Sequence, residues 1–281
     1  MDKIQNAMTV DVEEYYQVSA FEKAIDRKEW ESINSSVENN VARILSLFDD
    51  KQVKATFFVL GWVAERHPQM IKSIVQNGHE LASHGYSHIR VANQNKEEFR
   101  EDVSKTKKIL EDISGESVVG YRAASFSINS VEHWAHSELL ESGYKYSSSV
   151  YPVVHDLYGV PDAPGHAYRP FDAELLEIPL SALKFCGLRV PCSGGGYFRL
   201  FPYSLSNYLI NTYNKREKRP GIFYFHPWEI DTEQPRLDNI NLKTRFRHYN
   251  GLEKMEGRLS KLCQSFTWNR MDKIFLDYSV S

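Results

Sequence analysis

Four short segments of the sequence carry side chains that could bind a metal ion and move protons. The first is the acidic segment at residues 9–15, in which Asp11 and Glu13 lie two residues apart. Side chains two apart on a strand point to the same face, and two carboxylates on one face repel unless a cation lies beside them. Taken alone, the pair is also compatible with a solvated strand end.

The second segment contains His84 and His88, four residues apart and directly after the strand predicted at residues 79–83. Two such histidines can converge on one metal if the loop between them makes a helical turn. One carboxylate and two histidines form a three-ligand site for a divalent metal with open coordination positions. Such a metal activates water and polarises a carbonyl oxygen, so that a free carboxylate and a free histidine can act as base and acid.

Arg122 and His226 mark the other two segments. Arg122 follows a predicted strand at residues 118–121, and His226 follows the apolar stretch at residues 221–225. In isolation, the arginine is compatible with a structural ion pair and the histidine with a buried structural role. All four segments, however, fall at the C-terminal ends of predicted strands, where the sites of parallel α/β sheets lie. Their coincidence favours one common catalytic site.

Apolar strands alternate with amphipathic helices along the first half of the chain. Strands are predicted there at residues 7–12, 54–60, 79–83, 118–121 and 145–150, and the longest helix at residues 96–113; a further strong strand is predicted at residues 221–225 in the second half. The second half is less regular, with short strands at 175–179 and 188–191, helices at 204–214 and 252–266, and a turning loop at Gly194–Gly196. The alternation predicts an α/β fold with a parallel sheet, either open or closed as a barrel.

The composition excludes several classes of protein. The 281 residues are 42% hydrophobic and carry 34 Lys and Arg against 37 Asp and Glu, a net charge of −3. These values are not those of a disordered or collagen-like chain, and no nucleic-acid partner is indicated. The longest apolar run, residues 55–64, is about half of the roughly twenty residues that a membrane helix needs. With no visible signal peptide, we expect a cytoplasmic protein whose three cysteines (Cys186, Cys192 and Cys263) are packed, reduced thiols.

The order of these motifs resembles the polysaccharide deacetylases of carbohydrate esterase family 4, the NodB-homology group. The family's His-x-x-x-His motif is similar to residues 84–88, its acidic motif to residues 9–13, its arginine motif to residues 122–126 and its late histidine motif to residues 225–229. Residues 11–15, 195–202 and 226–236 extend the resemblance to the exosortase (PEP-CTERM) associated exopolysaccharide deacetylases. The resemblance covers nearly the whole chain.

The resemblance implies a distorted (β/α) barrel of about seven parallel strands, spanning residues 1–281 with an elaborated C-terminal half from about residue 150. It also implies metal-dependent removal of N-acetyl groups from an amino sugar in polysaccharide biosynthesis. By the family pattern, Asp11 is the general base, His226 the general acid, and Arg122 orients Asp11. His84 and His88 bind a divalent metal, for which zinc is the first expectation and cobalt, nickel or manganese the alternatives.

One departure from the family pattern changes the expected metal site. The common motif has two adjacent aspartates, of which the second binds the metal, and Val12 stands at that position here. We therefore expect Glu13, or alternatively Asp11, to complete the site. By the family pattern, a backbone N–H near Ser125 stabilises the oxyanion. The candidate substrate-binding side chains are Phe126, Tyr197 and Trp228.

Two other functions stay open on the sequence alone. Some members of the superfamily hydrolyse cyclic ureides or imides, but they tend to lack an intact histidine pair such as His84 and His88. A non-catalytic carbohydrate-binding protein on the same scaffold is favoured by the missing adjacent aspartate. In the cytoplasm, a deacetylase would meet a nucleotide-linked or lipid-linked sugar precursor. The sequence predicts neither the sugar nor the oligomeric state.

Overall fold

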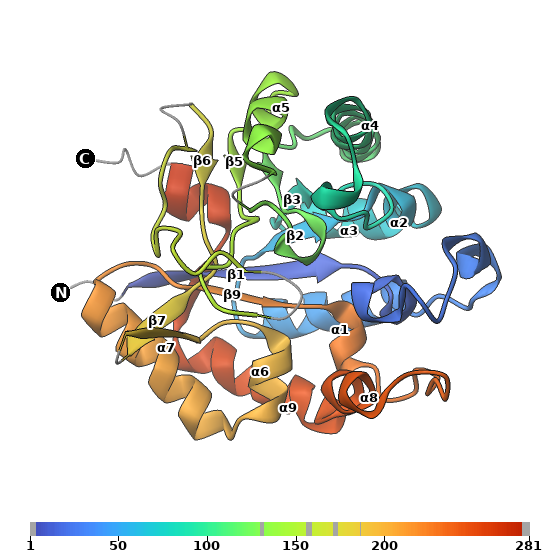
Figure 1. The fold of residues 1–281 in the computed structure, drawn as a ribbon. Coiled ribbons are helices and arrows are strands. Elements are labelled where there is room, and N and C mark those ends of the chain that lie inside the picture. Colours follow the sequence, from blue (N-terminus) through green and yellow to red (C-terminus); the bar gives the residue numbers. More distant parts are fainter. Residues whose placement is uncertain (1–3, 130–131, 156–158, 171–173, 186, 277–281) are drawn as a thin grey trace.

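The computed structural model describes residues 4–129, 132–155, 159–170, 174–185 and 187–276 (Figure 1). Within these residues, eight strands form one curved sheet, in the order β10-β1-β2-β3-β4-β5-β6, with β9 paired to the free edge of β1. Every pairing in this sheet is parallel. The strands are β1 (Gln5–Val12), β2 (Thr56–Val59), β3 (Glu80–Ser83), β4 (Gly120–Tyr121), β5 (Tyr146–Ser147), β6 (Leu176–Glu177), β9 (Ile222–Phe225) and β10 (Thr267–Asn269). The predicted distorted (β/α) barrel is thereby confirmed.

Helices pack around the outside of the sheet (Figure 1). They are α1 (Val37–Asp50), α2 (Gly61–Arg66), α3 (Pro68–Gln76), α4 (Lys96–Ser114), α5 (Ala135–Glu141), α6 (Gly195–Leu200), α7 (Tyr203–Glu217), α8 (Leu242–Tyr249) and α9 (Leu252–Ser265). The long helix expected at residues 96–113 is α4, which begins at a capping box between Asn95 and Glu98 and ends at Gly115 with φ +73°. None of the helices in the described ranges is long and apolar enough to cross a bilayer.

The seam between β6 and β9 leaves the barrel open, because no strand ladder joins these two strands in the described part of the chain. Ser181 bridges the seam instead. Its hydroxyl oxygen accepts the N–H of Ile222 at 2.7 Å, and its carbonyl accepts the Ser193 hydroxyl at 3.1 Å. The second half of the chain therefore closes the barrel through side chains rather than through a regular ladder.

Two local predictions differ from the structure, and one strand was not predicted. The strand expected at residues 145–150 is paired only over Tyr146–Ser147, because the N–H groups of Ser149 and Val150 donate to the Glu177 carboxylate instead of to a neighbouring strand. The turning loop expected at Gly194–Gly196 instead begins a short helix, α6. Strand β10 was not predicted, and it pairs with the first residues of β1. Of the cysteines, Cys192 and Cys263 are free and buried, whereas Cys186 lies outside the described residues.

Candidate metal centre and active site

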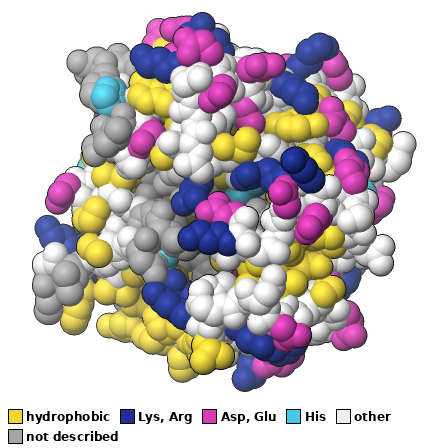
Figure 2. All heavy atoms as spheres, turned by 45° about the vertical axis from the view of Figure 1, so that its right-hand side comes forward, with side chains coloured by type: hydrophobic (Ala, Val, Ile, Leu, Met, Phe, Trp, Pro, Cys, Tyr) yellow, Lys and Arg dark blue, Asp and Glu magenta, His cyan; other side chains and the backbone are white. Residues whose placement is uncertain are grey.

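The C-terminal ends of the strands bring most of the predicted site residues to one cavity of about 610 Å³. The face at which β1 ends comes forward in Figure 2, where charged side chains surround a hollow in the middle of the view. The predicted residues that line the cavity are Asp11, Glu13, His84, His88, Ser125, Phe126, His226 and Trp228. Arg122 lies behind Asp11, fully buried.

Glu13, His84 and His88 have the geometry of a cation site. One ligand atom of each residue lies within 4.8 Å of the others, and all three side chains are buried. Glu13 Oε2 lies 3.0 Å from His88 Nε2, yet this oxygen accepts no hydrogen bond of acceptable geometry. A buried carboxylate oxygen without a donor is costly, and a cation between these atoms would satisfy it. The donor set of one carboxylate and two imidazoles also suits a divalent metal.

The backbone explains why Glu13 can occupy this place. The side chains of Met8, Val10 and Val12 alternate toward the helices and belong to the apolar core there. Strand β1 ends at Val12, and the Glu13 N–H donates to the carbonyl oxygen of Asp11 at 3.1 Å, which closes a turn across Val12. The turn directs Glu13 into the cavity, whereas residue 12 faces the core.

Substitution Val12→Asp is therefore expected to destabilise the fold without adding a metal ligand. The new carboxylate would be buried among apolar side chains, and we expect the free energy of unfolding to fall by at least about 3 kcal/mol. Urea denaturation measures this loss, with Val12→Ala as the control that removes only apolar contacts and loses less. A double variant Val12→Asp, Glu13→Ala that folds stably and binds a cation would contradict this description of the turn.

The two histidines converge without the helical turn that the sequence reasoning required. The loop from His84 to His88 bends instead at Gly85 and His88, whose φ angles are +75° and +53°. The Asp102 carboxylate anchors the loop by accepting the Tyr86 N–H at 3.1 Å. His84 Nδ1 lies 2.8 Å from the carbonyl oxygen of Arg122, so Nδ1–H donates and Nε2 keeps its lone pair. Burial lowers the pKa of His84 to about 4, although the negative charges of Asp11 and Glu13 act in the opposite direction.

Arg122 gives Asp11 a fixed counter-charge and orientation. Its Nη1 donates to Asp11 Oδ1 at 2.6 Å and to the Thr9 hydroxyl at 2.8 Å. Its Nε donates to the Ser148 carbonyl at 3.2 Å, and its guanidinium lies 4.0 Å from the ring centre of Phe58. Since Arg122 occupies Oδ1, Asp11 Oδ2 is the oxygen nearer to His226, at 4.0 Å from its Nε2.

His226 lies beside Asp11 Oδ2, the carboxylate oxygen that Arg122 leaves free. Its Nδ1 is 2.7 Å from Glu229 Oε1, and its Nε2 is 3.6 Å from Glu13 Oε1. Burial disfavours the charged imidazole, but the hydrogen bond to Glu229 and the charges of Glu13, Glu229 and Asp11 outweigh it and raise the pKa of His226 to about 9. Burial would likewise raise the pKa of Glu13, yet the neighbouring imidazoles lower it to about 2. The raised pKa of His226 and the lowered pKa of Glu13 favour a protonated imidazole beside an ionised Glu13 carboxylate.

Ser125 and Phe126 adopt the left-handed conformation, with φ +52° and +49°. Such angles are strained for residues other than glycine, and they concentrate at functional sites. The Ser125 hydroxyl lies 2.7 Å from that of Ser19, which ties this turn to the segment after β1. Ring contacts with Tyr224 and Tyr151, at 4.9 and 5.7 Å between centroids, hold Phe126 in place.

The remaining two aromatic candidates differ from the expectation. The indole of Trp228 stacks on His226 at 5.2 Å and on His248 at 4.2 Å, so both of its faces are covered and neither is free for a sugar ring. Tyr197 is not among the residues that line the cavity, and it packs against Phe201 on α6. Sequence reasoning missed Glu229, although its position three residues after His226 is the spacing of a side-chain contact across one turn.

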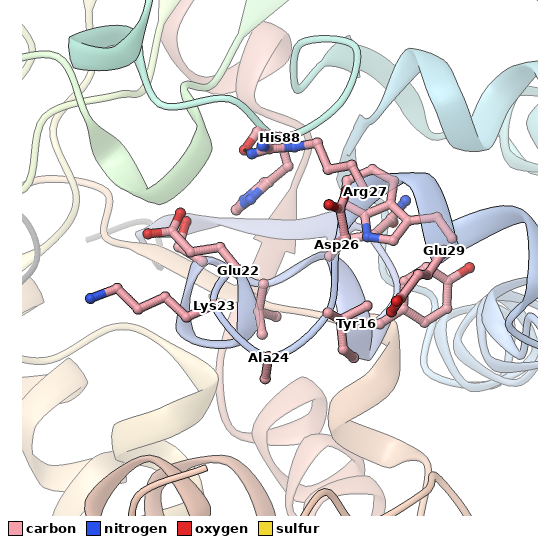
Figure 3. Close-up of a pocket in the computed structure, with 13 residues that line it drawn as sticks. Tyr16, Glu22, Lys23, Ala24, Asp26, Arg27, Glu29 and His88 are labelled. Carbon is pink, nitrogen blue, oxygen red and sulfur yellow. Dashed lines mark hydrogen bonds between the residues drawn. The ribbon is translucent and has the colours of Figure 1, made fainter. Parts of the chain in front are cut away.

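A second cavity of about 420 Å³ adjoins the first, and His88 lines both. Its other walls come from the three short 3₁₀ helices Tyr15–Gln17, Ser19–Phe21 and Arg27–Ser32 and the turns between them. Figure 3 shows Glu22 and Lys23 on one side of it and Arg27 extending toward His88. The Arg27 guanidinium donates to the backbone oxygens of Ser87 and His88 at 3.1 and 3.4 Å.

Two family models match the two halves of the chain. Residues 29–143 match polysaccharide deacetylase, and residues 148–276 match a domain of unknown function (DUF3473). The chain is 41% identical to a peptidoglycan-N-acetylglucosamine deacetylase of Bacillus cereus over 73 residues. These residues make up 26% of each chain. It is 29% identical over 113 residues to a peptidoglycan deacetylase of Helicobacter pylori, which is 40% of this chain and 38% of the relative. The chain thus spans well under two thirds of these curated relatives.

A solved structure supports the fold over a longer stretch. A Mycobacterium smegmatis protein assigned to the polysaccharide deacetylases superposes with a TM-score of 0.63 at 21% identity. The superposition covers 97% of this chain and 88% of the other. At this identity the likeness concerns the fold.

Proposed function

We propose that this protein is a metal-dependent hydrolase that removes N-acetyl groups from an amino sugar. The proposal starts from the polysaccharide deacetylase family, which the family model and the curated relatives support. The observation that carries the proposal is the convergence of Glu13, His84 and His88 beside Asp11 and His226. Asp11, Glu13 and His226 lie outside the matched residues 29–143, so their roles rest on this geometry. We also propose that both halves of the chain act as one unit, because strands from each form the same sheet.

In this proposal, Glu13, His84 and His88 hold one divalent cation, with zinc as the first choice for a carboxylate and two imidazoles. When bound, the cation would supply Lewis acidity, lowering the pKa of water and polarising the acetamide carbonyl. The hydrogen bond between His84 Nδ1 and the carbonyl of Arg122 supports this arrangement, since it holds the proton on Nδ1 and leaves Nε2 free to bind the cation. The orphaned Glu13 Oε2 supports it independently.

The protein's own groups then move the protons. Asp11 Oδ2 accepts a proton from the attacking water while Arg122 holds the other carboxylate oxygen. The backbone N–H of Ser125, in the strained turn, is the candidate for stabilising the oxyanion, since the N–H of Phe126 already donates to the Ala123 carbonyl at 3.0 Å. His226 Nε2 donates its proton to the leaving nitrogen, which an amide requires because an amine anion is a poor leaving group. Proton transfers of this kind accelerate reactions by about 10²–10⁴-fold.

Acetate release tests the proposed reaction directly. The protein should release acetate from N-acetylglucosamine oligomers and should not turn over allantoin or a cyclic imide. Turnover of the cyclic compounds without acetate release would instead support a cyclic amidohydrolase. Binding of the oligomers with no turnover of either class would support a non-catalytic carbohydrate-binding protein.

We further propose that the substrate is a sugar chain of exopolysaccharide biosynthesis rather than a free monosaccharide. The resemblance of residues 195–202 and 226–236 to exopolysaccharide deacetylases supports a role in exopolysaccharide biosynthesis. The two adjoining cavities, about 610 and 420 Å³ in volume, support a substrate longer than one sugar unit.

Substitution Ala24→Trp tests the contribution of the second cavity, which Ala24 lines. The indole would fill this space, so we expect kcat/KM to fall about 10-fold for a tetrasaccharide, equivalent to about 1.4 kcal/mol of lost binding, and to stay unchanged for a monosaccharide. Ala24→Ser is the matched control and should behave like the unaltered protein. An equal effect of Ala24→Trp on both substrates would remove the second cavity from the proposed substrate site.

A further inference from the structure

We propose that Arg199 is a positioning residue, which fixes the Glu229 carboxylate against His226 and so aims the imidazole at the leaving nitrogen. This inference rests on the proposed function and deepens it. It also gives a role to the domain of unknown function at residues 148–276, which contains all three of these residues.

Arg199 lies on α6, and its guanidinium is buried and makes four hydrogen bonds. Nε donates to Glu229 Oε2 at 2.7 Å, and the exposed fractions of the two side chains are only 2% and 1%. Nη1 donates to the carbonyls of His248 and Asn250 at 2.9 and 2.6 Å, and Nη2 donates to that of Arg247 at 3.2 Å. These four hydrogen bonds, to Glu229 and to the segment at residues 247–250, fix the position of the guanidinium. The guanidinium in turn fixes the Glu229 carboxylate.

The Glu229 carboxylate divides its two oxygens between Arg199 and His226. Oε2 accepts from Arg199, while Oε1 accepts from His226 Nδ1 at 2.7 Å and from the His226 backbone N–H at 3.2 Å. The Nδ1–H bond keeps a proton on the nitrogen that faces away from the cavity, so Nε2 is directed toward Asp11 and Glu13. The stack on Trp228 holds the plane of the ring. The orientation of His226 therefore depends on the carboxylate that Arg199 fixes.

Gly195 shows that α6 is shaped around this carboxylate. A Cβ atom at residue 195 would lie 2.1 Å from Glu229 Oε2, so any other residue would displace the carboxylate. Gly195 and Arg199 are four residues apart on α6, and they therefore face the same side of the helix. One residue makes room for the carboxylate and the other binds it. Burying a charged pair carries a large desolvation penalty. The Arg199–Glu229 pair is therefore better explained by its role in orienting His226 than by a contribution to stability.

The test separates proton delivery to the leaving group from general structural damage. The variants are Arg199→Met and the nearly isosteric Glu229→Gln, which provides a second test if Arg199→Met does not fold. With an N-acetylglucosamine oligomer we expect kcat to fall about 100-fold at unchanged KM and unchanged metal content. With 4-nitrophenyl acetate, whose leaving group needs no proton, we expect kcat to change by less than about threefold.

Arg258→Met is the matched control. Arg258 donates to the carbonyls of Phe198, Arg199 and Phe201 at 2.7, 2.9 and 3.0 Å, so it holds the same helix without touching Glu229. The Arg258→Met protein should not lose amide hydrolysis selectively over ester hydrolysis. Parallel loss of amide and ester hydrolysis in both test variants, or a selective amide loss in Arg258→Met, would overturn the positioning role. Absence of acetate release by the unaltered protein would instead refute the proposed function, and this inference with it.

Discussion

Substitution His84→Ala should abolish both cation binding and acetate release. His84 is one of three buried residues whose ligand atoms lie within 4.8 Å of one another, and no fourth His, Cys, Asp or Glu joins this cluster among the described residues. Since a cation supplies several kcal/mol of transition-state stabilisation, we expect acetate release to fall at least about 1,000-fold. Metal analysis of the purified variant, together with an acetate assay, measures both effects.

His67→Ala is the control for this experiment. His67 lies away from the cavity, with its Nε2 3.2 Å from the Ser35 hydroxyl and its Nδ1 3.3 Å from Glu38. This variant should keep the metal content and the activity of the unaltered protein, whereas His88→Ala should behave like His84→Ala. A His84→Ala protein with full metal content and normal acetate release would refute the metal site.

Substitution Asp11→Asn should leave the cation bound but abolish turnover. The amide oxygen cannot accept the proton of the attacking water, and we expect acetate release to fall by about 10²–10⁴-fold. Because the base acts on the water and not on the leaving group, hydrolysis of 4-nitrophenyl acetate should fall equally. An equal loss of amide and ester hydrolysis would distinguish the role of Asp11 from that of His226, because variants that disturb His226 should lose only amide hydrolysis.

Stability provides a second measurement on Asp11→Asn. Arg122 is fully buried and loses its only carboxylate partner in the described structure, so we expect the free energy of unfolding to fall by about 3 kcal/mol. Thr9→Val is the control, since it removes another side-chain partner of Arg122 but leaves the carboxylate in place. An Asp11→Asn protein with normal turnover would show that another group removes the proton.

Much of the fold and of the site could be predicted because the relevant patterns are local. The alternation of Val10, Asp11 and Val12 along β1 indicates that Asp11 faces the opposite side of the sheet from the two valines. The strand predicted at residues 79–83 places His84 at a strand end. Parallel strands end at the same edge, which is why residues as distant as Asp11 and His226 share one cavity.

The features that were missed depend on contacts between distant residues. Strand β10 is only three residues long, and its pairing with β1 leaves no periodic pattern to detect. The contact between Arg199 and Glu229 spans 30 residues, and neither residue type indicates a buried pair by itself. Trp228 was a reasonable candidate for stacking on a sugar, but its position between His226 and His248 arises only when α8 packs against the site.

The most direct test of the account is a metal titration of the chelator-treated protein, monitored by acetate release from an N-acetylglucosamine oligomer. We expect negligible release without added metal and a rise that saturates at one equivalent of Zn²⁺ or Co²⁺. The Glu13→Ala protein should show no such rise, because it lacks the carboxylate that the turn at Val12 directs into the cavity. Full acetate release by the metal-free protein, or an unchanged titration of Glu13→Ala, would contradict a catalytic cation at Glu13, His84 and His88.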